Sequence, residues 1–354
     1  MNHVHHSSNG HKRRIGLLTG GGDAPGLNSI IEAVVRVLSR NDFEIIGICD
    51  GFEGIFSGRT QPLTIDTIRG AHSTAGTLLG TSNKSRIDGR EKEFAEKFSR
   101  LKLEGLIAAG GDGTFAALQR VIDSIPTIGV PKTIDNDLSG TELTFGFDTA
   151  CSVVADSADA LRATAEAHHR AIVIETMGRN AGWIALGGGL ASYADVILVP
   201  ERPFSREKLL HFLNREKNSG RKGLILVASE GARADDEKAH LTTSKLGGSH
   251  GNRYEGFSNA LVEWINAESS WESRNVVLGH LQRSKAPTTT DRFLTSAMGV
   301  EVAELALNKK WQTAVVYRNG RVTHAPITDI MQPAKMISNE HPWIDLAQQL
   351  GIFI

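Results

Sequence analysis

The segment Arg14-Ile-Gly-Leu-Leu-Thr19 and the segment Gly20-Gly-Gly-Asp-Ala-Pro-Gly26-Leu-Asn28, which follows it directly, decide the fold class. A short apolar run that ends in glycines is typical of a buried strand and a tight turn. After the turn, apolar residues recur at the spacing of one helix face, at Ile30, Ile31, Val34, Val35 and Leu38. This pattern predicts a strand, a glycine turn and a helix, which is the first half of a βαβ unit.

Similar apolar runs, separated by helix-like segments, recur along the rest of the chain. They lie at residues 44–49, 105–109, 126–130, 170–175, 196–199, 223–229 and 274–278. Short buried strands that alternate with helices are typical of parallel sheets covered by helices on both faces. The chain has 354 residues, and domains of about 100–200 residues are usual. We therefore predict an α/β protein with two doubly wound, three-layer (αβα) domains and mainly parallel sheets.

The composition excludes several classes of function. Hydrophobic residues make up 40% of the chain, and no apolar run is as long as the ~20 residues of a membrane helix. The net charge of −1 excludes the strong positive field of a non-specific nucleic-acid binder. Cys49 and Cys151 are too few for a disulfide framework or a cysteine-built zinc site. We expect a cytoplasmic protein without nucleic-acid or membrane partners, and a disordered, histidine-rich leader at residues 1–12 rather than a signal peptide.

Turns rich in glycine and carboxylates follow the predicted strands. In open α/β sheets, ligands bind beyond the carboxyl ends of the strands. At residues 20–22, a backbone without Cβ atoms can close around a phosphate; a tight turn without a ligand is the alternative. A second turn, Gly110-Gly111-Asp112-Gly113-Thr114, favours the phosphate site, because Asp112 can hold a Mg²⁺ ion bound to a polyphosphate.

The segment Thr133-Ile-Asp135-Asn136-Asp137 also follows a predicted strand. Of two neighbouring carboxylates, one can accept the proton of a hydroxyl group while the other orients it or lies near the metal. An Asx-rich turn without a catalytic role is the alternative. The segment therefore supplies candidates for a general base.

The second half of the chain places cations near strand ends, and each alone is typical of a solvated charge. Together they suit a sugar phosphate, because arginine binds phosphate through a planar fork, and Glu230 can accept hydrogen bonds from sugar hydroxyls. These cations are Arg170, Arg179, Arg274, His280 and Arg283. A magnesium-polyphosphate site that faces a sugar-phosphate site indicates phosphoryl transfer.

A series of motifs, in this order, resembles the 6-phosphofructokinase family over residues 13–310. The motifs are Gly21-Gly-Asp-Ala-Pro-Gly-Leu-Asn28, Gly110-Gly-Asp-Gly-Thr114, Pro131-Lys-Thr-Ile-Asp-Asn-Asp137, Gly146-Phe-Asp-Thr-Ala150, Met177-Gly-Arg179 and Leu278-Gly-His-Leu-Gln-Arg283. One of them alone would be a weak signal, and the whole series in order is specific. The resemblance implies a phosphofructokinase-like fold and transfer of a phosphoryl group to the 1-hydroxyl of fructose 6-phosphate.

The resemblance also implies a role for each residue that matches a family motif. Asp135 matches the catalytic base, Thr133 and Asp137 match its neighbours in the substrate and magnesium region, and Asp112 matches the magnesium carboxylate. The nucleotide contacts match Gly21, Gly111, Asp112, Gly113 and Thr114. The sugar-phosphate contacts match Thr133, Asp135, Met177, Gly178, Arg179, Glu230, His280 and Arg283.

Arg170 and Arg274 match arginines that, in the family, reach the site from a neighbouring subunit. The resemblance therefore implies a homo-oligomer with shared active sites, a tetramer or a dimer. We expect a phosphoryl-donor domain at residues 13–147 plus 283–331. We expect a sugar-phosphate domain at residues 148–282 plus 332–354.

The phosphoryl donor is left open between ATP and pyrophosphate, because two residues point in opposite directions. Gly113 takes the place where pyrophosphate users in the family carry an acid, and glycine leaves room for the α-phosphate of ATP. Lys132 is the residue of pyrophosphate users, in which it neutralises the leaving group. The mixed pair resembles a branch that includes ATP users, so we favour ATP with Mg²⁺.

Other departures from the family concern phosphate contacts and regulation. Asn83 replaces an arginine near the transferred phosphate, and Lys84 can supply the missing charge. Glu32 replaces an arginine that helps to bind effectors in bacterial members, which predicts weak or no regulation by ADP or phosphoenolpyruvate. The segment 283–292 lacks the family's glycines, which makes sedoheptulose 7-phosphate a second candidate acceptor.

Other classes of function compete with this interpretation. A related kinase would act on another phosphosugar or a nucleoside, and a catalytically inactive protein would sense sugar phosphates or nucleotides. A sensor has no need of Asp112, Asp135 and Asp137 together, which disfavours it. A dinucleotide-binding oxidoreductase does not fit, because Pro25 lies at the third glycine position of G-x-G-x-x-G.

Overall fold

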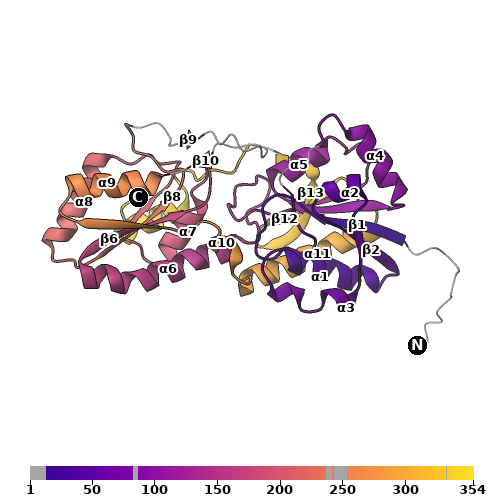
Figure 1. Cartoon of the computed structure of the whole chain (residues 1–354), viewed down its shortest axis with the longest axis horizontal. Helices are drawn as coiled ribbons and strands as arrows, with labels where there is room; N and C mark the ends of the chain where they lie inside the picture. The colour runs from indigo at the N-terminus through magenta and orange to yellow at the C-terminus, as the bar shows by residue number, and fades with distance from the viewer. Residues whose placement is uncertain (1–12, 83–86, 237–240, 243–252, 255, 332) are drawn as a thin grey trace.

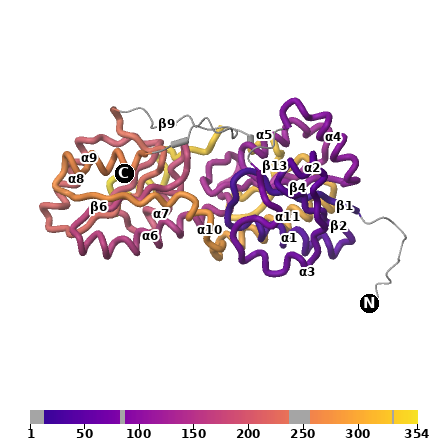
Figure 2. Tube along the Cα trace, in the orientation of Figure 1, coloured from indigo at the N-terminus to yellow at the C-terminus, as the bar shows by residue number. Residues whose placement is uncertain are grey.

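The computed structural model describes residues 13–82, 87–236, 241–242, 253–254, 256–331 and 333–354. The predicted leader and the candidates Asn83 and Lys84 lie outside the described residues. The described chain forms two α/β units side by side, with β1 in one unit and the C-terminus in the other (Figures 1 and 2).

The first unit is built on a seven-stranded sheet in the order β13-β12-β5-β4-β1-β2-β3. Neighbouring strands are parallel except at the two edges, where β3 and β13 are antiparallel. The strands are β1 (Arg13–Thr19), β2 (Phe43–Ile48), β3 (Thr60–Leu63), β4 (Gly105–Gly110), β5 (Thr127–Pro131), β12 (Thr313–Arg318) and β13 (Arg321–Pro326).

Helices cover both faces of the first sheet because its strands are apolar on both sides. Successive side chains of a strand point to opposite faces, so Leu17 and Leu18 of β1 lie in different cores. One face packs on α1 (Leu27–Ser39), α3 (Ile65–Ile68) and α11 (Thr289–Leu307). The other face packs on α2 (Glu53–Ser57), α4 (Glu91–Arg100), α5 (Asp112–Gln119) and η2 (Ile327–Met331). The short helix η1 (Ala71–Ser73) lies beside α1.

The second unit has a smaller, fully parallel sheet in the order β11-β6-β8-β7. Its strands are β6 (Arg170–Thr176), β7 (Val196–Leu198), β8 (Leu224–Ser229) and β11 (Glu272–Val277). One face packs on α6 (Phe147–His168), α7 (Trp183–Ala191) and α12 (Pro342–Gln349), and the other on α8 (Arg206–Asn218) and α9 (Phe257–Glu268). The helix α10 (Leu281–Ser284) follows β11, and β9 (Leu241–Thr242) pairs with β10 (Arg253–Tyr254).

The predicted α/β class with mainly parallel sheets is confirmed, and every predicted strand is present within one or two residues at its ends. The strands β3, β12 and β13 were not predicted: β3 and β13 mix polar and apolar residues without a buried run, whereas β12 contains the short buried run Ala314-Val315-Val316. β12 and β13 form a hairpin around Asn319-Gly320, where both residues have positive φ, a known hairpin signal. No helix in the described part of the chain has the length and apolarity to cross a membrane.

The two units are tied together where α6 begins. Asp291, at the start of α11, accepts hydrogen bonds from the N–H groups of Gly146 and Thr149, each at 2.9 Å. The Thr149 hydroxyl donates to the same carboxylate at 2.5 Å. Burial raises the pKa of Asp291 to about 6. A helix of the first unit thus caps the first helix of the second, while the predicted domain limits stay a prediction.

Candidate active site

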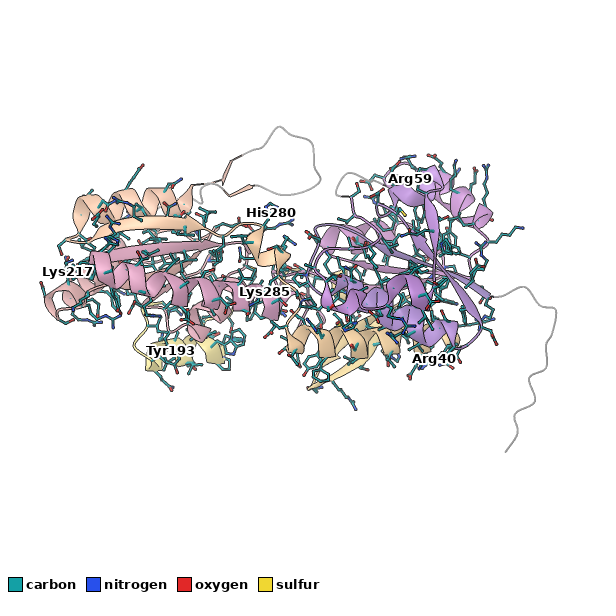
Figure 3. The ribbon with its side chains drawn as sticks, turned by 60° about the horizontal axis from the view of Figure 1, so that its bottom comes forward. Arg40, Arg59, Tyr193, Lys217, His280 and Lys285 are labelled. Carbon is teal, nitrogen blue, oxygen red and sulfur yellow. The ribbon has the colours of Figure 1, made fainter. Side chains whose placement is uncertain are left out.

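Most of the candidate residues lie at the carboxyl ends of strands from both sheets; Arg170 and Arg274 do not. In the first unit, the glycine loop (residues 20–26) follows β1, the Asp112 turn follows β4 and the Asp135 turn follows β5. In the second unit, residues 177–179 follow β6, Glu230 follows β8 and residues 278–283 follow β11. Figure 3 places His280, just before α10, at the end of the second unit that faces the first.

Lys132 lies beneath the glycine loop and is only 3% exposed. Its ammonium group donates a hydrogen bond to the carbonyl of Gly22, and a Cβ atom at Gly21 would lie 3.5 Å from Nζ. Burial, together with the charge of Arg283, lowers the pKa of Lys132 to about 8, although nearby carboxylates, Asp135 first, oppose the shift. The structure therefore holds a buried cation directly behind the loop that the sequence assigned to phosphate.

Asp135 and Asp137 share a turn that Thr133 and Asn136 shape. The N–H group of Asp135 donates to the hydroxyl of Thr133 at 3.0 Å, and Asn136 has a positive φ of 52°. The Asp135 side chain is 5% exposed, and its Oδ1 atom has no hydrogen-bond partner among the described residues. A buried acceptor without a donor is costly, so this oxygen is poised to take a proton donor from a ligand.

Asp137 is influenced by the other carboxylates of the site. Burial, then the negative charges of Asp135 and Asp112, raises the pKa of Asp137 to about 6, and the charge of Arg179 opposes the shift. The two units meet at this turn through Lys335, whose N–H group donates to the carbonyl of Asp137 and whose carbonyl accepts a hydrogen bond from Trp183 of the second unit.

Asp112 is the candidate for a metal ligand. It is exposed at the start of α5, and Oδ1 accepts a hydrogen bond from the N–H group of Gly113 at 2.7 Å. No group of three or more His, Cys, Asp or Glu side chains among the described residues could hold a metal ion. Mg²⁺ in nucleotide enzymes is usually held by one or two carboxylates plus phosphate oxygens. Asp112 fits that pattern.

The glycines around Asp112 differ in how much space a side chain would find at each position. A Cβ atom at Gly110 would lie 2.1 Å from Oγ1 of Thr114, and one at Gly20 would lie 2.5 Å from the same atom. The buried Thr114 therefore leaves no room for a side chain at Gly20 or at Gly110. A Cβ atom at Gly113, by contrast, would meet no described atom within 4 Å, so the space in front of Gly113 is open.

The turn after β6 depends on two unusual backbone conformations. Gly178 has φ of +143°, and a Cβ atom there would lie 2.4 Å from the carbonyl oxygen of Ala181. Arg179 also has positive φ, and its N–H group donates to Oε1 of Glu230 at 2.9 Å. Burial raises the pKa of Glu230, and the charge of Asp135 adds to the shift. Glu230 thus fixes this turn beside the Asp135 turn, with Met177 half-buried between strand and turn.

Arg283 connects the second unit to the glycine loop. Its Nη1 atom donates to the carbonyl of Asp23 at 2.5 Å, and a Cβ atom at Gly22 would lie 3.1 Å from Nη1. From the sequence, Arg283 was expected to contact the sugar phosphate, and the structure places it next to the glycine loop and Lys132. Its guanidinium therefore lies at the boundary between the two candidate phosphate sites.

Arg170 and Arg274 do not lie at this site within one chain. Arg170 begins β6, six residues before the turn, which corresponds to about 20 Å at ~3.3 Å per residue. Its Nη2 atom lies 3.0 Å from Glu272, and Arg274 donates to the same carboxylate at 2.6 Å. Both arginines lie on β6 and the edge strand β11. The expectation that they cluster with Arg179 therefore does not hold within the single chain.

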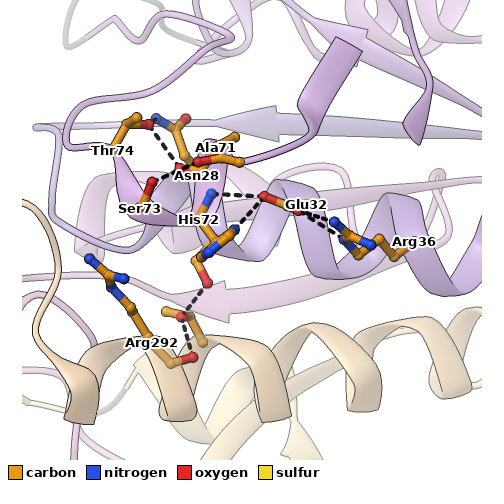
Figure 4. A network of polar contacts seen from close by, with 11 residues as sticks. Asn28, Glu32, Arg36, Ala71, His72, Ser73, Thr74 and Arg292 are labelled. Carbon is orange, nitrogen blue, oxygen red and sulfur yellow. Dashed lines mark hydrogen bonds and ion pairs between the residues drawn. The ribbon is translucent and has the colours of Figure 1, made fainter. Parts of the chain in front are cut away.

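The carboxylate of Glu32 on α1 is bonded to Arg36 and His72 of the same unit (Figure 4). It accepts hydrogen bonds from Arg36 at 2.6 Å and from the N–H group of His72 at 2.9 Å. Although burial raises the pKa of Glu32, these hydrogen bonds hold it at about 2. Glu32 is therefore ionised, and its negative charge would repel the phosphate of an effector, as predicted from the sequence.

Two residues that contribute to the site were not singled out from the sequence. Asp23, inside the quoted glycine motif, raises the pKa of Lys132 by its charge. Lys335 comes from a segment without any recognisable pattern and donates its N–H group to the carbonyl of Asp137 at 2.7 Å. The quoted motif could have indicated Asp23, whereas no sequence signal marks Lys335.

The geometry defines an α/β protein in which carboxylates and cations lie at the carboxyl ends of strands from two mainly parallel sheets. A family profile described as phosphofructokinase matches residues 14–306. The chain is 39% identical over 354 residues to an ATP-dependent 6-phosphofructokinase of Chloroflexus aurantiacus, an alignment that covers 96% of this chain and 97% of that protein. It is 38% identical over 331 residues to a pyrophosphate–fructose 6-phosphate 1-phosphotransferase of Amycolatopsis methanolica, covering 92% of this chain and 97% of that protein. The chain belongs to the phosphofructokinase family.

A solved structure shares the fold. It is a pyrophosphate-dependent phosphofructokinase from Marinobacter aquaeolei, with a TM-score of 0.81 and 23% sequence identity over 97% of this chain and 88% of that chain. The expected phosphofructokinase-like fold is therefore confirmed, and so is the resemblance on which it was based.

Proposed function

We propose that the chain transfers the terminal phosphoryl group of ATP to the 1-hydroxyl of fructose 6-phosphate, giving fructose 1,6-bisphosphate in the cytoplasm. The observation that carries this proposal is the buried, unpartnered Oδ1 atom of Asp135. It lies in a turn that is joined to the second unit through Lys335, which bonds both Asp137 and Trp183. A base between a donor site and a sugar-phosphate site suits transfer to a hydroxyl group.

The residues of the chain divide the reaction between them. Asp135 accepts the proton of the 1-hydroxyl. At the same time the oxygen of that hydroxyl bonds to the terminal phosphorus of ATP, and the bond from that phosphorus to ADP breaks. Lys132 and Arg283 place positive charge beside the glycine loop, where the charge of the transferred group develops. When bound at Asp112, Mg²⁺ supplies positive charge to the donor phosphates.

The sugar phosphate is held by the second unit. Arg179 and His280 face its phosphate, and Glu230 and Met177 lie beside the sugar. Glu230 also fixes the turn that carries Arg179 through the hydrogen bond at 2.9 Å. Sedoheptulose 7-phosphate is a second acceptor, because residues 283–292 lack the glycines of the family motif.

ATP is the donor that the open space at Gly113 supports. No described atom lies within 4 Å of a Cβ atom built there, so a nucleotide α-phosphate has room. Lys132 supports pyrophosphate as the alternative donor, and relatives with both printed activities are about equally similar to this chain. Initial rates with ATP and with pyrophosphate, each over fructose 6-phosphate and sedoheptulose 7-phosphate, test the proposal. If no fructose 1,6-bisphosphate formed with ATP and none formed with pyrophosphate, the proposal would be refuted.

The activity should fall on the alkaline side because Lys132 loses its charge. Its pKa is lowered to about 8, so the charged form that the donor needs is lost as the pH rises above 8. We expect kcat/KM for ATP to fall about tenfold per pH unit above that point. Lys132→Arg, which stays charged, should move the alkaline limb to higher pH. An unchanged limb in this variant would assign the titration to another group.

Arg170 and Arg274 complete the site of a neighbouring subunit in a homo-oligomer, a tetramer or a dimer. The position of Arg274 on β11, an edge strand of the second sheet, supports this arrangement, since an edge strand is available to a partner. Arg170 lies on the neighbouring strand β6. Asp135→Asn and Arg274→Ala subunits, each weakly active alone at low fructose 6-phosphate, should regain activity when refolded together. A random one-to-one mixture should recover about a quarter of the unmutated activity, because that share of sites combines both intact residues. A mixture no more active than its separate parts would contradict shared sites.

A further inference from the structure

Residues 333–339 cross from the first unit to the second and pass directly behind the Asp135 turn. On the first unit, the hydroxyl of Ser139 donates to the carbonyl of Pro333. On the second unit, the N–H group of Ile337 donates to Glu201 at 3.1 Å. Lys335 lies between these two anchors, so it is placed at the boundary of the two units.

The backbone of Lys335 binds both units at once. Its N–H group donates to the carbonyl of Asp137 at 2.7 Å. Its carbonyl accepts a hydrogen bond from Nε1 of Trp183, at the start of α7, at 2.8 Å. A single residue therefore connects the carboxylate turn of the first unit to a helix of the second.

The side chain of Lys335 binds the same turn from another direction. Its Nζ atom donates to Oδ1 of Asn136 at 3.1 Å and to the carbonyls of Thr141 at 3.1 Å and Glu142 at 2.9 Å. These acceptors satisfy all three donors of an ammonium group. The side chain leaves no donor for a ligand, so its effect on the reaction must pass through the turn that it holds.

Asn136 is the residue on which this contact acts. Its φ of 52° lies in the left-handed region, which is uncommon for residues other than glycine, although asparagine adopts it more readily than most. Besides Lys335, the N–H group of Thr144 donates to Oδ1 of Asn136 at 3.1 Å. Asp135 and Asp137 flank Asn136, so a change in its backbone would turn both carboxylates.

We propose that Lys335 is a positioning residue, whose ammonium group and backbone hold the Asp135–Asp137 turn in its reactive conformation against the second unit. This inference rests on the proposed function for its effect on kcat. Burial lowers the pKa of Lys335 to about 8, and the charges of Asp137 and Glu142 oppose the shift, which agrees with a cation enclosed by the turn. The contact between the side chain and Asn136 spans 199 positions of the chain.

Lys335→Met tests the ammonium group, because it keeps an unbranched side chain without donors. We expect kcat to fall about 10- to 100-fold, in the range of a misplaced catalytic group, with KM for fructose 6-phosphate changed less than about threefold. Lys335→Arg should recover part of the loss, since it keeps the charge and the donors. Lys92→Met, on the exposed face of α4, is the matched control and should behave as the unmutated chain.

Asn136→Gly provides a second route that spares the fold, because glycine adopts positive φ without strain. If Lys335 acts through Asn136, the double variant should lose no more kcat than the more affected single variant. If the losses of kcat in Lys335→Met and Asn136→Gly multiplied in the double variant, the two residues would act independently and the proposal would be overturned. A kcat of Lys335→Met within twofold of the control would also overturn it.

Hydrogen exchange separates this inference from the proposed function, because it needs no activity. Exchange in the peptide covering residues 131–144 should become at least about tenfold faster in Lys335→Met than in Lys92→Met. Unchanged exchange would overturn the positioning role even in an active enzyme. Faster exchange in a chain that transfers no phosphoryl group would support the contact and refute the function.

Discussion

Asp135→Asn is expected to lower kcat about 10²- to 10⁴-fold, the usual contribution of a general base, and to leave KM for fructose 6-phosphate within about threefold. The amide has nearly the shape of the carboxylate but cannot take the proton of the 1-hydroxyl. Oδ1 of Asp135 has no other hydrogen-bond partner among the described residues, so few contacts within the chain are lost. Steady-state rates over a range of fructose 6-phosphate concentrations measure both parameters.

Asp123→Asn is the matched control for this variant. Asp123 is exposed in the turn between α5 and β5, so the same chemical change there should leave kcat unaltered. If Asp135→Asn kept more than a third of the unmutated kcat, Asp135 would not be the base.

Gly113→Asp is expected to lower kcat/KM for ATP at least about 100-fold. The new carboxylate would occupy the open space in front of Gly113 and repel the α-phosphate of a nucleotide. The backbone of Gly113 does not have the positive φ that would make another residue strained. An acid in the first turn of a helix is favourable, so the stability of the fold should be preserved. Initial rates at varied ATP measure the effect.

Gly113→Ala is the control, because it adds a small uncharged side chain at the same position, whereas Gly113→Asp adds a larger, charged one. Its methyl group would meet no described atom within 4 Å, so kcat/KM for ATP should change less than about fivefold. Activity with pyrophosphate should survive in Gly113→Asp. Pyrophosphate has only the phosphate that is transferred and the phosphate that leaves, so it has no group at the position of the α-phosphate. Unchanged ATP kinetics in Gly113→Asp would show that the steric argument is wrong.

The sequence predicted the parts of the site that are continuous in the chain. The glycine loop, the Asp112 turn and the Asp135 turn each follow an apolar strand, and the topology of a parallel sheet brings such turns to one edge. The same logic does not place Arg170 and Arg274, because an arginine near a strand gives no indication of which end of the sheet it occupies; their role in the site of a neighbouring subunit stays a prediction. The register, with Arg170 opposite Glu272, decides this.

Contacts between distant segments could not be predicted from one sequence. Lys335 binds Asn136 across 199 positions, and Asp291 caps α6 across 142 positions. Each depends on the packing of complete units and leaves no periodic pattern or motif. The strand β13 was missed for a related reason: it lies at one edge of the sheet, where polar residues interrupt the apolar run. The neighbouring strand β12 does contain a buried apolar run, Ala314-Val315-Val316, which could have indicated it.

The most direct test of the central claim is a crystal structure with fructose 6-phosphate and a non-hydrolysable ATP analogue. The account predicts that a carboxylate oxygen of Asp135 lies about 2.6–3.2 Å from the 1-hydroxyl of the sugar. It also predicts that Arg179 contacts the sugar phosphate and that Arg283 lies between the two ligands. A complex in which Asp135 faces away from the sugar, with Arg179 and Arg283 on a surface that touches neither ligand, would contradict it.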